Sequence, residues 1–191
     1  MRYIFTIFFL LFSFFPTNSQ VLEGNLIEND LPCDLARNFD ILDLDSIKNS
    51  TLAWINGNQE CVYSLLDKMT DLYIKNGNFD SFSCLSSVCN NSTGKVSDYM
   101  IDVNGSIFYS NFAPYIKYLF YFKSNYGEEH CMVKHLISAL SLQVASTKEA
   151  DRERKIITDY IKSESKKAKF TQDELNYVMS VYERINTKLW E

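Results

Sequence analysis

The segment 58–77, NQECVYSLLDKMTDLYIKNG, decides the fold class of this chain. Its apolar residues recur at steps of three and four, which places them on one face of an α-helix. Asn76 and Gly77 follow, and both tolerate the left-handed conformation in which many helices end. We therefore predict a helix from about Asn58 to Lys75. Its apolar face consists of Val62, Leu65, Leu66, Met69, Leu72 and Tyr73.

Similar periodicity recurs along the chain and predicts helices over 34–47, 113–124, 128–144, 146–167 and from 171 onward, with a short helical turn near 80–88. Two capping boxes, Ser146 to Glu149 and Thr171 to Glu174, indicate where the last two helices begin. The sequence has only 3 Pro and 6 Gly, too few for a turn-rich all-β fold. We expect an all-α fold, an irregular bundle of five to six helices.

The segment 98–109 is ambiguous. Asn104-Gly105 lies between two short apolar runs, which is a signal for a two-residue β-hairpin over 99–109. The same dipeptide can also end a helix. We favour a helix that ends at Val103, because an isolated hairpin is marginally stable, and the hairpin is the alternative.

The N-terminal segment 1–19, MRYIFTIFFLLFSFFPTNS, has the layout of a secretory signal peptide. One positive charge precedes a short apolar run, and small residues follow it. The run is too short to span a bilayer, and no later apolar run reaches that length. We expect cleavage after Ser19 and a single helical domain over 20–191 without a transmembrane segment; an uncleaved anchor is the alternative. The product is then secreted, or periplasmic if the host is bacterial.

All five cysteines lie beyond this segment, and in an oxidising compartment they are disulfide candidates. An odd number leaves at least one without an intramolecular partner. We favour a bridge between Cys33 and Cys61, and a second bridge that involves Cys84 and Cys89. The last two can pair with each other only if a loop separates them, since they point apart on one helix. Cys131 is then the odd thiol.

Four asparagines begin Asn-x-Ser/Thr sequons, namely Asn49, Asn90, Asn91 and Asn104. In a eukaryotic secretory pathway such asparagines accept N-linked glycans and occupy surface positions. We predict a glycoprotein in that case. Chance occurrence in a chain rich in Asn, Ser and Thr is the alternative, and the sequons have no meaning in a bacterial host.

Residues 108–126 contain nine aromatic side chains, which lie on more than one face of the helix predicted there. Either this helix is buried nearly all round, or one aromatic face contacts a ligand or partner. Buried tyrosine hydroxyls need hydrogen-bond partners, and five tyrosines are many to satisfy in one interior helix. The candidate binding residues are therefore Tyr115, Tyr118, Tyr121 and Phe122, at least two of which we expect to line a pocket or form an exposed patch.

The sequence offers little support for catalysis or metal binding. His130 and His135 are the only histidines, and their spacing of five does not place two ligands on one helix face. A pair of His130 with Cys131 is unlike a nucleophilic site, because adjacent helical residues do not face each other. Asp40, Asp43 and Asp45 lack the Gly and Glu that a calcium loop requires. We predict no catalytic residues, no metal and no cofactor.

The net charge of −5 argues against nucleic acid and against anionic membranes as partners. We expect an exported binding or interaction protein without catalytic activity, whose partner is a protein. A carrier of an apolar small molecule is the alternative. A secreted hydrolase that uses His130 or His135 with acidic residues is less favoured.

Overall fold

A computed structural model describes residues 30–146 and 149–186, and every regular element in those ranges is helical. The all-α prediction is therefore confirmed, although the helices are shorter and more numerous than five to six. The segment 1–19 lies outside the described residues. The elements are α1 (Leu31–Arg37), the 3-10 helix η1 (Phe39–Ile41), α2 (Leu44–Asn49), α3 (Thr51–Trp54), α4 (Gln59–Asn76), α5 (Phe79–Asn91), α6 (Gly94–Ser110), α7 (Phe112–Tyr126), α8 (Cys131–Ala145), α9 (Ala150–Lys167) and α10 (Gln172–Glu183).

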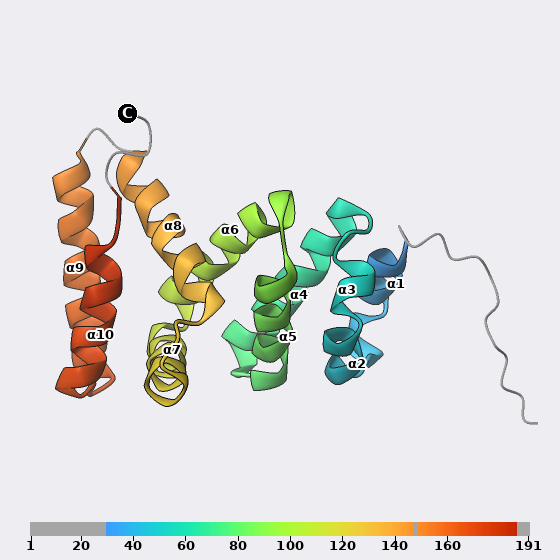
Figure 1. The fold of residues 1–191 in the computed structure, drawn as a ribbon, viewed down its shortest axis with the longest axis horizontal. Helices are drawn as coiled ribbons and strands as arrows, with labels where there is room; N and C mark the ends of the chain where they lie inside the picture. Colours follow the sequence, from blue (N-terminus) through green and yellow to red (C-terminus); the bar gives the residue numbers. More distant parts are fainter. Residues whose placement is uncertain (1–29, 147–148, 187–191) are drawn as a thin grey trace, which may run out of the picture.

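The helices form an elongated array that follows the order of the chain, from α1 at one end to α9 and α10 at the other (Figure 1). Helix α4 packs on α1 and α6, and α6 packs on α8. Helix α5 packs on α2 and α4, and α7 packs on α6 and α10. One continuous hydrophobic core runs through these contacts. Within the described ranges, no helix is long and apolar enough to cross a membrane.

The single helix predicted over 34–47 is wrong, because this segment is divided into α1, η1 and α2. Leu42 adopts an extended conformation, and the side chain of Asp43 then accepts a hydrogen bond from the backbone of Asp45 as the N-cap of α2. The breaks let Ile47 and Trp54 turn into the core, where the indole of Trp54 donates to the carbonyl of Ile47 at 2.9 Å.

Helix α6 corrects both interpretations of the segment 98–109. It continues through Asn104 and Gly105 to Ser110, so the helix does not end at Val103 and no hairpin forms. Gly105 faces α8: a Cβ atom built on it would lie 3.5 Å from Cβ of Ala139. This position therefore lies in the contact between α6 and α8, and tertiary packing overrides the local turn preference.

Two cysteine pairs lie at disulfide-bonding distance. Cys33 and Cys61 join α1 to α4, as expected, with their Cα atoms 4.7 Å apart. The second pair is Cys89 with Cys131, which joins α5 to α8. The expectation that Cys84 shares the second bridge is wrong, because Cys84 and Cys89 lie on one continuous helix. Cys84 is a free, buried thiol that donates a hydrogen bond to the carbonyl of Leu44.

The C-terminal helices begin differently from each other. Thr171 and Glu174 form the predicted capping box of α10, with both reciprocal hydrogen bonds present. Ser146 instead is the C-cap of α8, where its hydroxyl donates to the carbonyl of Gln143. Two residues of that predicted capping box, Thr147 and Lys148, lie outside the described residues.

Candidate functional site

Four aromatic rings form a connected surface across two helices. Phe79 begins α5, and Tyr118, Phe122 and Tyr126 follow one another at steps of four along α7. Their ring centroids are 5.3 Å apart from Phe79 to Tyr118, 6.5 Å from Tyr118 to Phe122 and 4.7 Å from Phe122 to Tyr126. We call these four residues the aromatic face.

The aromatic face is exposed at its ends and supported at its centre. Phe79 is 54% exposed and Tyr126 is 64% exposed, whereas Tyr118 and Phe122 are half-buried. Phe82 lies fully buried behind them, with its ring centroid 4.9 Å from that of Tyr118. Ring contacts on the inner side therefore limit the rotamers open to the two central side chains.

His130 is the second support of the aromatic face. Its ring lies 4.9 Å from that of Phe122 and 5.5 Å from that of Tyr118, with nearly perpendicular planes. The residue is buried and is the N-cap of α8: Nδ1 accepts a hydrogen bond from the backbone N–H of Met132 at 3.3 Å. Burial lowers the pKa of His130 to about 4, so the ring is neutral at physiological pH.

The hydrogen bonds of His130 define its tautomer. Because Nδ1 accepts from Met132, the proton of the neutral ring is on Nε2. Nε2 lies 2.7 Å from the hydroxyl oxygen of Ser86 and therefore donates to it. A general base must instead accept the proton of the serine hydroxyl. This geometry gives the Ser86–His130 pair a structural role.

His135 lies beside the Cys89–Cys131 bridge. Its Nε2 is 3.0 Å from the hydroxyl of Ser97, and its Nδ1 is 3.4 Å from Sγ of Cys89. The pKa of His135 is lowered, mainly by burial. Among the residues that the structure describes, no three His, Cys, Asp or Glu side chains gather in a way that could hold a metal ion.

The four predicted binding residues divide between surface and core. Tyr118 and Phe122 belong to the aromatic face. Tyr121 is 59% exposed on the same helix. Tyr115, in contrast, is fully buried, and its hydroxyl donates to Oδ1 of Asn104. The tyrosine-rich helix is thus half core and half surface.

Sequence reasoning missed Phe79 and did not single out Tyr126. Both are placed by helix ends: Phe79 directly follows Asn78, the N-cap of α5, and Tyr126 directly precedes Gly127, the left-handed C-cap of α7. The signal available in the sequence was the apolar residue next to each cap. Nothing in the local pattern indicated that the two ends would lie on one surface.

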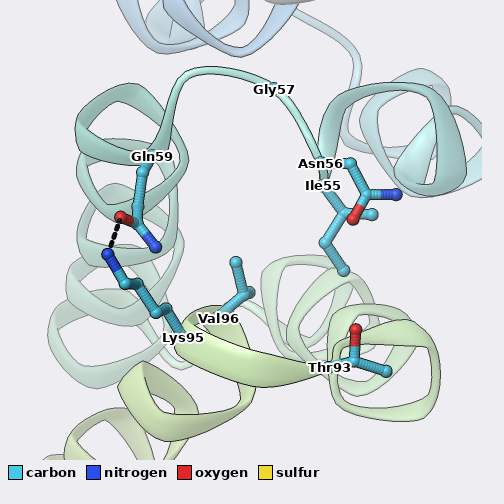
Figure 2. Close-up of a pocket in the computed structure, with 7 residues that line it drawn as sticks. All are labelled: Ile55, Asn56, Gly57, Gln59, Thr93, Lys95 and Val96. Carbon is cyan, nitrogen blue, oxygen red and sulfur yellow. Dashed lines mark hydrogen bonds between the residues drawn. The ribbon is translucent and has the colours of Figure 1, made fainter.

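A separate depression of about 210 Å³ lies between the loop after α3 and the start of α6 (Figure 2). The side chain of Lys95 lies along one side of it and donates to Oε1 of Gln59 at 3.4 Å. The volume is below the 300 Å³ or so typical of small-molecule sites, and much of the lining is polar. The lining residues are Ile55, Asn56, Gly57, Gln59, Thr93, Lys95 and Val96.

The predicted glycan acceptors differ in exposure. Asn49, Asn90 and Asn91 are exposed. Asn104 is completely buried, and its Nδ2 donates to the carbonyl of Met100. The expected surface position of Asn104 is therefore wrong, because this asparagine belongs to the interface of α6 with α7.

Comparison with known proteins gives one result: no family model matches the chain, and no curated protein or solved structure matches it.

Proposed function

We propose that this chain is an exported helical binding protein whose aromatic face contacts a partner protein. The observation that carries the proposal is the connected row of rings from Phe79 to Tyr126, exposed at both ends and backed by buried groups. Tyr and Phe are enriched at the centres of protein interfaces, where they bury a large area at a small entropic cost. Side chains whose rotamers are limited before binding lose less conformational freedom on association.

The alternatives have weaker support. A carrier of an apolar small molecule needs a large apolar cavity, and the depression near Lys95 is small and partly polar. A hydrolase that uses His130 needs this histidine to accept a proton from its nucleophile, and Nε2 of His130 donates to Ser86 instead. Export is supported by the charged, apolar and small-residue segments of 1–19 and by the two cysteine pairs.

The test compares wild-type protein with the double variant Phe79→Ser/Tyr126→Ser. Proteins that the wild type captures from extracellular fluid of the source organism are identified by mass spectrometry, and each is then purified for titration. We expect the double variant to bind the partner at least about tenfold more weakly, since two interface residues worth 1 kcal/mol or more are removed.

The matched control is Leu52→Ser, which removes an apolar side chain that is 70% exposed on α3. It should bind the partner as the wild type does. Equal loss in both variants would indicate non-specific hydrophobic association, and undiminished binding by the double variant would refute the proposed surface. The N-terminus of the secreted product tests export independently: Gln20 is expected.

A further inference from the structure

Three of the four sequon asparagines lie at the ends of two neighbouring helices. Asn49 is the last residue of α2, and Asn90 and Asn91 are the last two residues of α5. All three side chains are exposed. Each therefore has open solvent around it in the folded protein, which a bulky glycan requires.

Contacts between α2 and α5 place these three asparagines near one another. The start of α2 lies beside the middle of α5, where Sγ of Cys84 donates to the carbonyl of Leu44 at 3.2 Å. Just beyond the end of α2, the hydroxyl of Ser87 donates to that of Thr51 at 3.2 Å. Nδ2 of Asn91 donates to the carbonyl of the same Ser87 at 2.7 Å. The two helices therefore run in the same direction, and their C-terminal ends are neighbours.

Asn104 cannot carry a glycan in this fold. Its side chain is fully buried, Nδ2 donates to Met100, and Oδ1 accepts from Tyr115. A sugar attached to Nδ2 would have to lie within the packed contact of α6 with α7 and would force the two helices apart. A chain modified there would not reach the structure described above.

We infer that the chain, when it is exported through a eukaryotic secretory pathway, carries two N-linked glycans, one on Asn49 and one on the Asn90–Asn91 pair, and none on Asn104. In this reaction the amide nitrogen forms a bond to the first sugar of a lipid-linked oligosaccharide. The bond from that sugar to the lipid diphosphate breaks, and the amide loses one proton. Only one member of the pair is modified, because two oligosaccharides on consecutive residues would occupy the same space.

The glycans would lie at the opposite end of α5 from the aromatic face. Phe79 is the first residue of this helix and Asn91 is the last. At a rise of 1.5 Å per residue, about 18 Å of helix separates them. The sugars would cover the end near Ser87 and leave the aromatic face open to a partner. This inference rests on the export in the proposed function, but not on the identity of the partner.

The full chain, with its own residues 1–19, is produced in a eukaryotic cell that secretes proteins. The secreted product is treated with a peptide N-glycosidase, which leaves Asp at each formerly modified position, and is mapped by mass spectrometry. Two glycans are expected on the wild type and one on Asn49→Gln. One is also expected on Asn90→Gln/Asn91→Gln, and none on the triple variant.

The inference would be overturned by a secreted, folded product that is glycosylated at Asn104. It would also be overturned by one that is not glycosylated at Asn49 or at the Asn90–Asn91 pair. Neither result bears on binding by the aromatic face. A chain that stays inside the cell with all thiols free would overturn both the inference and the proposed export. Circular dichroism of the secreted wild type and of the glutamine variants verifies that each product is helical.

Discussion

The hydroxyl of Tyr115 in α7 donates a hydrogen bond to Oδ1 of Asn104 in α6, and both side chains are completely buried. Asn104 also donates through Nδ2 to the carbonyl of Met100, one turn earlier in its own helix. These polar groups satisfy one another inside an apolar core. The pair fixes how α7 packs against α6, and so where the aromatic face lies.

Substitution of either partner should destabilise the protein. Asn104→Leu leaves the Tyr115 hydroxyl without its partner, and Tyr115→Phe leaves Oδ1 of Asn104 without its donor. Each should lower the free energy of unfolding by about 1–3 kcal/mol, because a buried polar group is left unsatisfied. Urea unfolding measures the loss. The double variant should lose less free energy of unfolding than the sum of the two single losses, and additive losses would contradict the coupling of the pair. The control Tyr121→Phe, on the exposed side of α7, should change the free energy of unfolding little.

Gly105 provides a second test of the contact between α6 and α8. The Cβ atom of an alanine there would meet Ala139 at 3.5 Å, an ordinary van der Waals distance. Gly105→Ala should therefore stabilise the protein by about 0.5–1 kcal/mol, because alanine is the better helix former. Gly105→Leu should destabilise it by about 1–3 kcal/mol through overpacking. Thermal unfolding distinguishes the two, and equal stability of both variants would show that the helices are not in close contact.

His130 should make stability depend on pH. Burial lowers its pKa in the folded protein to about 4, from 6.5. Between these values the unfolded chain binds a proton that the folded chain does not. The lowered pKa of His130 therefore adds to the free energy of unfolding. This added stability is fully present above pH 6.5 and is lost as the pH falls towards 4, by up to about 3 kcal/mol.

His130→Asn is the matching variant, because asparagine can still accept the hydrogen bond at the N-cap of α8 and does not titrate. The difference in unfolding free energy between wild type and variant, measured from pH 7.5 to pH 4, removes the contribution of the carboxylates. We expect the wild type to lose more stability than the variant over this range. Parallel curves would indicate that His130 is accessible to water and protonates normally.

Cys84 should be chemically inert in the folded protein. The thiol is buried, and burial is the largest of the effects that together raise its pKa to about 11. The reactive thiolate is therefore scarce at neutral pH. Iodoacetamide should not label Cys84 in native protein and should label it once guanidinium unfolds the chain, which peptide mapping detects. Rapid native labelling of Cys84, or labelling of Cys89 or Cys131 without reductant, would contradict this arrangement of the cysteines.

The sequence predicts best those features that depend on local chemistry. The apolar periodicity of α4, the left-handed Gly77 and the capping box at Thr171 all rest on residues within a few positions of one another. The prediction of a helix end or a turn at Asn104-Gly105 fails for the converse reason. Its turn preference is local, but the groups that decide its conformation, Tyr115 and Ala139, come from other helices.

The candidate site shows the same division. Tyr118 and Phe122 were predictable from the density of aromatic residues, whereas Phe79 reaches them only through the packing of α5 near α7. His130 is an unusual N-cap, since Ser, Thr, Asp and Asn are the common ones. Its place beneath the rings follows from the Cys89–Cys131 bridge and the bond to Ser86, neither of which a local pattern reveals.

Both cross-links described above tie α1 to α4 and α5 to α8, and α9 and α10 contain no cysteine at all. The disulfide bonds therefore stabilise the part of the array from α1 to α8, whereas α9 and α10 are held against it by noncovalent contacts. On heating or proteolysis, α9 and α10 should therefore unfold or be cleaved first. The disulfide-linked part that stays folded should still contain the aromatic face.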